Sequence, residues 1–234
     1  MKQENYIRGM IMIILSAFFF ACMNVSVRLA GDLPSVQKSF FRNLVAAFFA
    51  AIILIKNHTA PKVEKTQWGS LFLRCAFGTL GILCNFYAID HLLVADASIL
   101  NKLSPFFAII FSFLLLKEKI KPAQAMCVIL AFVGCLFVVK PGFENAHLIP
   151  ALIGVCGGLG AGIAYTMVRK MGTHGVKGPV IVFYFSCFSC IIVIPWIVFH
   201  YQPMSLRQLL TLLLAGLFAA GGQFTITAAY TYAP

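Results

Sequence analysis

The chain has 234 residues, of which 61% are hydrophobic and 11% charged, with a mean hydropathy of +0.92. A composition this apolar excludes an ordinary water-soluble domain and indicates a membrane protein. The formal net charge is +11, but the basic residues are dispersed over short loops. A nucleic-acid-binding protein would gather them on one polar face with aromatic neighbours, so no nucleic-acid partner is expected.

Eight continuously apolar segments follow one another, each about 16–22 residues long, close to what a hydrocarbon core of about 30 Å requires of a helix. The predicted spans are 9–29, 40–55, 69–88, 95–116, 123–139, 148–168, 180–199 and 209–229. Because apolar residues do not alternate with polar ones, the segments predict helices and not barrel strands. The first segment contains Asn24 and Arg28 and precedes no small-residue cleavage site, which favours a span over a signal peptide. The expected fold is an all-α polytopic membrane protein with about eight transmembrane helices.

The basic residues outside the spans are distributed unevenly between the two sides of the membrane. With a cytoplasmic N-terminus, the inner segments hold eleven: Lys2, Arg8, Lys56, Lys62, Lys65, Lys117, Lys119, Lys121, Arg169, Lys170 and Lys177. The outer segments hold five: Arg28, Lys38, Arg42, Lys140 and Arg207. By the positive-inside rule, this bias predicts a multi-pass protein of the cytoplasmic (inner) membrane with its N-terminus in the cytoplasm.

The cysteines and histidines indicate no metal or redox chemistry. All eight cysteines lie within predicted spans, where they suit the role of a small apolar residue better than a disulfide framework. Cys187 and Cys190 form a C-x-x-C, but in mid-span and without a thioredoxin-like strand before it. The histidines lie at span ends or in loops, without metal-binding spacing. Neither a cofactor nor a metal site is expected.

The span 148–168 contains glycines at a spacing that predicts close helix packing. Gly154, Gly158 and Gly162 repeat every four residues, and such small residues let helix backbones approach each other in a membrane. The run from Gly157 to Gly162 matches a dinucleotide-binding fingerprint in its letters only, because it lies inside a span and follows no strand.

A shift of 141 positions aligns the chain with itself, span on span and loop on loop. The matched residues include Val27 with Val168, Arg28 with Arg169, Gly31 with Gly172, Phe77 with Phe218, Gly81 with Gly222, and Ala88 with Ala229. The first copy contains five spans, an odd number, so the second copy must be inverted in the membrane, an arrangement typical of secondary transporters. The expected domains are a first five-helix repeat, 1–141, and a second, 142–234, that stops before its last two helices.

Lys102 is the most informative polar residue inside a span. It lies about eight residues into the span 95–116, roughly 12 Å below the outer surface. A lysine at this depth costs about 2–3 kcal/mol unless it faces a cavity or a partner. Three residues later, Pro105 removes a backbone donor and leaves the carbonyl of Asn101 without its intrahelical partner. Asn101, Lys102 and a helix kink at Pro105 therefore form a candidate substrate site. The alternative is a lysine that reaches outward to the lipid headgroups.

Further candidate substrate-binding residues are polar groups deep in other spans: Asn24, Asn85, Tyr87, Tyr165 and Gln223. Each alone could simply hydrogen-bond a neighbouring helix, but the set favours a cavity. Arg28, Arg42 and Arg74 lie near span ends, where a long basic side chain reaches the interface easily, so the pattern predicts an anchoring role for each. Arg42 is the exception, because it and Asn43 are two polar residues that open the span 40–55 together. Arg42 therefore joins the candidate substrate-binding residues.

Acidic residues are missing from the middle of every predicted span. Asp90 and Asp96 flank the outer turn after the third span, and Glu118 lies at an inner end. An exporter of cationic drugs would need a buried carboxylate to bind cation and proton alternately. The intramembrane cations instead predict a small-molecule substrate with an anionic group, such as an amino acid or another carboxylated metabolite.

Several segments together resemble a known family. They are Arg74–Gly78, Asn85–Ala88, Ala97–Phe107 with its proline, Leu114–Glu118 and the ending Ala228–Pro234. The whole chain resembles the drug/metabolite transporter superfamily in its ten-helix EamA-like branch. The resemblance implies two inverted five-helix repeats, cytoplasmic termini, a central cavity and the transport of small metabolites, often outward. It also implies that the final Ala-Pro opens a ninth helix.

The sequence thus predicts a secondary active transporter, by resemblance an exporter, that moves small carboxylated or amino-acid-like solutes across a lipid bilayer by alternating access. The alternative is a non-transporting helical membrane subunit or an integral membrane enzyme. An enzyme should show paired intramembrane carboxylates or a His/Asp cluster, which the spans lack, and a structural subunit gains nothing from Lys102. Proton coupling and a homodimer are both compatible with the sequence, although no buried carboxylate identifies a proton carrier.

Overall fold

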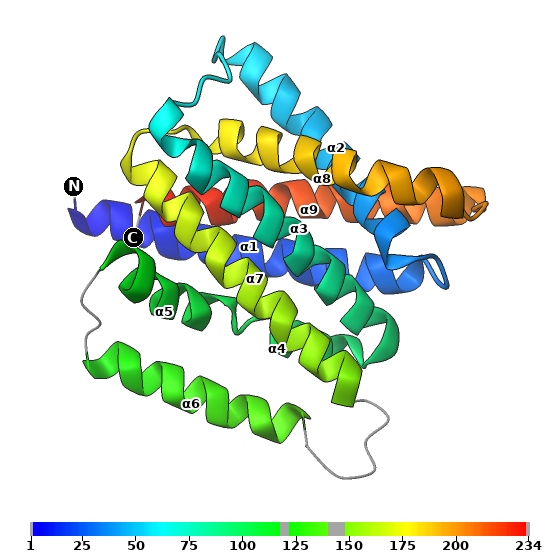
Figure 1. The fold of residues 1–234 in the computed structure, drawn as a ribbon, viewed down its shortest axis with the longest axis horizontal. Coiled ribbons are helices and arrows are strands. Elements are labelled where there is room, and N and C mark those ends of the chain that lie inside the picture. The colour runs from blue at the N-terminus through cyan, green and yellow to red at the C-terminus, as the bar shows by residue number, and fades with distance from the viewer. Residues whose placement is uncertain (1, 118–121, 140–147, 233–234) are drawn as a thin grey trace.

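The computed structural model describes residues 2–117, 122–139 and 148–232 (Figure 1). The helices in these ranges are α1 (Lys2–Leu29), α2 (Ser35–Lys56), α3 (Trp68–His91), α4 (Val94–Asn101), α5 (Ser104–Leu116), α6 (Pro122–Val139), α7 (Leu148–Thr173), α8 (Gly178–His200) and α9 (Leu206–Tyr232). A single 3₁₀ turn, Lys65–Gln67, leads into α3. Throughout the described ranges the regular structure is helical, which confirms the predicted all-α fold.

Seven helical segments are long and apolar enough to cross a membrane: Ile7–Leu29, Ser35–Lys56, Lys65–His91, Val94–Leu116, Leu148–Thr173, Gly178–His200 and Leu206–Tyr230. They match seven of the eight predicted spans and confirm a multi-pass membrane protein. The remaining prediction, 123–139, is helix α6. Within the described residues its apolar stretch, Ala125–Gly134, is shorter than the other seven.

Two predicted spans differ from the observed helices in ways that affect the site. Helix α2 begins at Ser35, before the predicted residue 40, and so takes Lys38 into the helical bundle. The predicted span 95–116 is divided between α4 and α5, with Lys102 and Leu103 between them. Pro105 lies in the first turn of α5, where a missing backbone donor is tolerated.

The helices form a bundle in which neighbours in space are often distant in sequence. The most extensive contacts join α1 to α9 and α3 to α7. Helix α2 packs against α8 and α9, and α5 packs against α7. Helix α6 lies at one edge of the bundle, against α4 and α5 (Figure 1).

Helix α7 uses glycines on two faces to bring its backbone close to its neighbours. On the face toward α3, a Cβ added at Gly160 would lie 2.9 Å from the carbonyl oxygen of Phe77. On the face toward α4 and α5, a Cβ at Gly158 would lie 2.8 Å from the carbonyl oxygen of Leu100. Any larger residue would force these helices apart, so α7 acts as the close-packed centre of the bundle.

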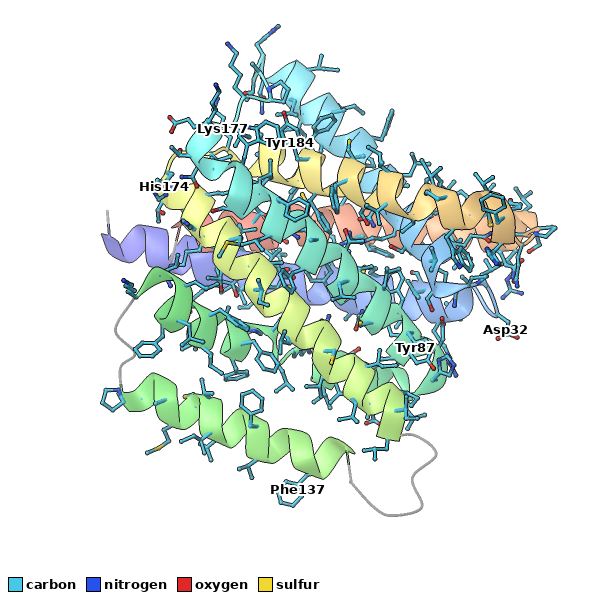
Figure 2. The ribbon with its side chains drawn as sticks, in the orientation of Figure 1. Asp32, Tyr87, Phe137, His174, Lys177 and Tyr184 are labelled. Carbon is cyan, nitrogen blue, oxygen red and sulfur yellow. The ribbon has the colours of Figure 1, made fainter. Side chains whose placement is uncertain are left out.

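The outside of the bundle is apolar and its interior is partly polar. Large side chains such as Ile14, Phe48 and Phe199 are exposed on the outside, as expected for contact with lipid. Figure 2 shows His174, Lys177 and Tyr184 near one end of the bundle, and Asp32 and Tyr87 near the other. Buried arginine and asparagine side chains lie between these ends, and they define the site.

Candidate functional site

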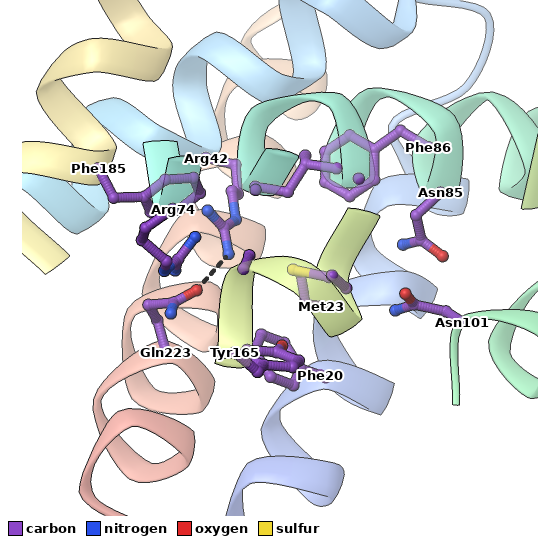
Figure 3. A pocket seen from close by; sticks show the side chains of 15 residues that line it. Phe20, Met23, Arg42, Arg74, Asn85, Phe86, Asn101, Tyr165, Phe185 and Gln223 are labelled. Carbon is purple, nitrogen blue, oxygen red and sulfur yellow. Dashed lines mark hydrogen bonds between the residues drawn. The ribbon is translucent and has the colours of Figure 1, made fainter. Parts of the chain in front are cut away.

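Two arginines from different helices meet in the interior of the bundle. Arg42 of α2 and Arg74 of α3 are each only 2% exposed. The Cζ atom of Arg74 lies 3.9 Å from the ring centroid of Phe185 in α8, and that of Arg42 lies 5.8 Å from the same centroid. Figure 3 shows the two guanidinium groups side by side at this ring. Two positive charges therefore share one buried space.

A glycine makes this arrangement possible. Gly78 follows Arg74 by one helical turn in α3, on the same face of the helix. A Cβ added there would overlap Nη1 of Arg74 and would lie 2.8 Å from Cε2 of Phe185. Because glycine has no side chain, the guanidinium of Arg74 can lie against the helix and under the aromatic ring.

Arg42 is held by neutral groups. Its Nη1 donates a hydrogen bond to Oδ1 of Asn43, and its Nη2 donates to Oε1 of Gln223 in α9 at 3.4 Å. Asn43 in turn donates from Nδ2 to Oγ of Ser189 at 2.8 Å. These bonds tie α2 to both α8 and α9 and fix the position of the charge without neutralising it.

Arg74 has no such support. No residue in the described part of the chain accepts a hydrogen bond from its guanidinium or forms an ion pair with it; the guanidinium makes a cation–π contact with the ring of Phe185. An isolated buried cation costs several kcal/mol even after the protein relaxes. Arg74 is therefore positioned to bind an acceptor that the described residues do not supply.

Other buried polar atoms near the arginines also lack a partner within the described ranges. They are Nε of Arg42, Nε of Arg74, Oδ1 of Asn85 and Nε2 of Gln223. An unsatisfied buried polar group costs about 1–3 kcal/mol, so most native groups are paired. The concentration of unpaired atoms in one region makes it a candidate ligand site.

The arginines line a small pocket that adjoins a larger cavity. The arginine pocket has a volume of about 50 Å³, and no carboxylate is among the described residues that line it. The larger cavity measures about 360 Å³ and lies between α1, the α4–α5 break, α7 and α9. Phe20, Asn101 and Tyr165 line both spaces. One solute could therefore occupy the two together.

The predicted site residues divide between these two spaces. Arg42, Asn85, Asn101, Tyr165 and Gln223 line the arginine pocket. Asn24, Lys102 and Pro105 line the larger cavity, together with Asn101 and Tyr165. Figure 3 shows the side-chain amides of Asn85 and Asn101 pointing toward each other.

Two candidates differ from expectation. Tyr87 lines neither space, because its ring stacks on His91 in the same helix with centroids 4.0 Å apart. Lys102 lines the larger cavity, but its side chain is exposed and the residue lies in the break between α4 and α5. Its charge is thus less costly than a position inside a continuous span suggested.

Arg74 is the residue that sequence reasoning misplaced. The anchoring role predicted for it is wrong, because the side chain is buried against Phe185 instead of reaching an interface. A signal was present in the sequence: Gly78 lies one turn away and leaves room on the same helix face. By contrast, Arg28 does act structurally, since its Nη1 donates at 2.8 Å to the carbonyls of Ile89 and Asp90 at the end of α3.

One end of the bundle is fastened by a separate polar cluster. Lys38 is 1% exposed and forms an ion pair with Asp90, whose other carboxylate oxygen accepts a hydrogen bond from Ser35 at 2.8 Å. Nearby, Gln37 and Gln202 exchange two hydrogen bonds, at 2.9 and 3.0 Å, between α2 and the α8–α9 loop. These contacts join the first turns of α2 to the end of α3 and to the α8–α9 loop.

A helical membrane bundle with a polar site between its helices is an arrangement found in membrane transporters for small solutes. The model of the EamA-like transporter family matches residues 7–140, and the chain belongs to this family. It is accordingly a multi-pass membrane transporter and not an enzyme, with lipid around it and a small molecule as substrate.

Similar proteins include transporters that are named for different solutes. The chain is 32% identical over 229 residues to the pseudopaline exporter CntI of Pseudomonas aeruginosa, covering 96% of this chain and 78% of that protein. It is 25% identical over 230 residues to a riboflavin transporter of Brucella anthropi, covering 92% and 78%. It is 27% identical over 236 residues to solute carrier family 35 member G1 of Homo sapiens, covering 94% and 64%. A solved structure titled "Crystal structure of protein" shares the fold with a TM-score of 0.71 at 13% identity, covering 94% of this chain and 78% of the other.

Proposed function

We propose that this protein is a secondary active exporter of small organic solutes that carry a carboxylate, including amino-acid-like metabolites, and that Arg42 and Arg74 bind the carboxylate. The observation that carries the proposal is a pair of buried arginines with unpaired donors and no carboxylate among the described residues that line their pocket. The pseudopaline exporter relative supports outward transport.

The electrostatics favour an anion over the other solute classes. A guanidinium presents planar donors that match a carboxylate in a two-point geometry, and such charge-assisted bonds are about twice as strong as neutral ones. A cationic solute would bring a third positive charge into a space of low dielectric, where like charges repel strongly. A neutral solute would leave both arginines without a counter-charge.

The helix pairing supports alternating access by two inverted repeats, residues 1–141 and 142–234. A shift of 141 positions carries α1 onto α7 and α3 onto α9. The contact between α1 and α9 in one arrangement therefore corresponds to the contact between α7 and α3 in the other. These two helix pairs make the most extensive contacts in the bundle. The arginine pocket lies where helices of both repeats meet, so rocking one repeat against the other would expose it alternately to the two sides.

The distribution of loops supports an orientation with the N-terminus in the cytoplasm of an inner membrane. The end of the bundle at which α1 begins also contains the end of α2 and the starts of α3 and α8 (Figure 1). Lys56 ends α2, Lys65 begins the turn before α3 and Lys177 precedes α8, so basic residues gather at this end. The end of the bundle with Lys38 and Asp90 then faces outward.

In this proposal a proton gradient drives transport, and an imposed pH gradient across the liposome membrane tests this part. Two copies of the protein also associate, and cross-linking of the purified protein tests that part.

The decisive experiment is transport into liposomes with the purified protein. Labelled amino acids and organic acids are offered to the native protein, to Arg74→Gln and to Lys56→Gln, which removes an exposed charge at the end of α2. We expect transport of at least one carboxylated solute, about tenfold or more reduced by Arg74→Gln and unchanged by Lys56→Gln. Transport of lipophilic cations with no response to carboxylates would overturn the proposal.

A further inference from the structure

We propose that the substrate presents a dianionic part to Arg42 and Arg74, either two carboxylates or one doubly charged phosphate-type group. This inference rests on the proposed function, because it specifies the substrate class of the same pocket. It depends on the number of buried charges in the arginine pocket, on the number of hydrogen-bond donors there, and on the shapes of this pocket and the larger cavity beside it.

The charge count leaves two buried positive charges without a counter-charge among the described residues that line their pocket. Both guanidinium groups are 2% exposed, and the described residues that line their pocket include no acid. The described ion pair that involves a buried cation, Lys38 with Asp90, lies at the fastened end of the bundle. A solute with one negative charge would leave a net buried cation, whereas a dianion neutralises both arginines.

The donor count points the same way. A guanidinium has about five N–H donors, and those of Arg74 meet no acceptor in the described part of the chain. Nε of Arg42 and Nε2 of Gln223 are also unpaired and contribute further donors. One carboxylate offers about four acceptor positions, fewer than the donors available. Two carboxylates, or the three oxygens of a phosphate group, would satisfy this set better.

The shape of the site separates a charged end from a body. A buried water needs about 10–15 Å³ on this volume scale, so the arginine pocket of about 50 Å³ holds small charged groups and little else. The rest of the solute would pass between Phe20, Asn101 and Tyr165 into the cavity of about 360 Å³. There the stacked rings of Tyr165 and Tyr230, with centroids 5.3 Å apart, offer an aromatic wall.

The test compares dianions with monoanions of equal length. Binding to the purified protein is measured by calorimetry at neutral pH for succinate against butyrate, glutarate against valerate, and glycerol phosphate against its singly charged methyl diester. We expect the dicarboxylate, the phosphate ester or both to bind about tenfold or more tightly than the matched compound. The dicarboxylate and phosphate pairs distinguish the two sources of double charge.

Two variants show whether the preference comes from the arginines. Arg74→Gln removes one charge and should reduce the preference for dianions to nearly none. Arg74→Lys keeps the charge and should retain most of the preference, and gel filtration and circular dichroism establish that both are folded. Lys56→Gln removes an exposed charge elsewhere and should leave the preference unchanged.

The outcomes separate this inference from the function on which it rests. Equal binding and transport of monocarboxylates and dicarboxylates would overturn the dianion inference and leave the carboxylate exporter standing. A dianion preference that survives in folded Arg74→Gln would overturn the assignment to the arginine pair. Binding of cations alone would overturn both proposals.

Discussion

The guanidinium of Arg74 lies against the ring of Phe185, with its Cζ atom 3.9 Å from the ring centroid, and its Nε has no hydrogen-bond partner within the described residues. An aromatic face attracts a cation weakly and does not neutralise it. The contact therefore holds the charge in place while leaving its donors available. This combination suits a binding group better than a structural one.

Replacing Phe185 should weaken substrate binding more than it weakens the fold. A desolvated cation–π contact contributes about 2 kcal/mol or less, so Phe185→Leu should raise the substrate Kd several-fold, up to about thirtyfold. Phe185→Trp should retain most of the affinity. Phe188→Leu is the matched control, because Phe188 lies on the same helix and packs edge-on against Phe72. Equal effects of the two leucine variants would contradict this role for Phe185.

Adding a single methyl group at Gly78 should displace Arg74. In Gly78→Ala the new Cβ would overlap Nη1 of Arg74, and the guanidinium would have to leave the ring of Phe185. Transport should fall about tenfold or more, while the helical content stays native. Gly69→Ala, in the same helix with nothing within 4 Å of the added Cβ, should behave like the native protein. Normal transport by Gly78→Ala would show that the position of Arg74 does not matter.

Breaking the ion pair between Lys38 and Asp90 should destabilise the bundle, and removing both partners should harm it less. Asp90→Asn leaves the charge of Lys38 buried and without its counter-ion, at a cost of about 2–4 kcal/mol, since Asp90 itself is 19% exposed. The double variant Lys38→Met/Asp90→Asn removes both charges. Thermal unfolding in detergent should rank the native protein first, the double variant second and Asp90→Asn last. Additive losses in the double variant would mean that the two residues do not interact energetically.

Lys102 should contribute less than Arg74. Its side chain is exposed at the larger cavity, and an exposed charge contributes about 0.2–1 kcal/mol to a pairing. Lys102→Ala should therefore change the substrate Kd only about twofold to fivefold, against tenfold or more for Arg74→Gln. Abolished binding in Lys102→Ala alone would reverse this order and restore Lys102 as the principal cation.

The sequence was sufficient to predict the positions of the helices and some of the residues that line the candidate site. Continuous apolar runs predict where helices lie, and Asn85, Asn101 and Gln223 attract notice because lipid excludes them; all three line the arginine pocket. Gly78 indicates room beside Arg74 on its helix face, but the burial of the Arg74 guanidinium depends on how Phe185 of α8 covers it, and no local pattern encodes that contact. Lys102 was given too large a role, because Pro105 predicts a kink nearby but does not show that the helix breaks at Lys102 and leaves its side chain exposed.

The two cations of the arginine pocket come from α2 and α3, while Tyr165, Phe185 and Gln223 on α7, α8 and α9 contribute neutral groups. The positions 141 residues after Arg42 and Arg74 are Phe183 and Ala215, so neither charge is duplicated. If the chain consists of two repeats as proposed, the first repeat binds the charged group of the substrate and the second repeat lines the pocket with uncharged side chains. The substrate would stay bound to the first half during the whole cycle, and a new specificity could evolve there without changing the second half.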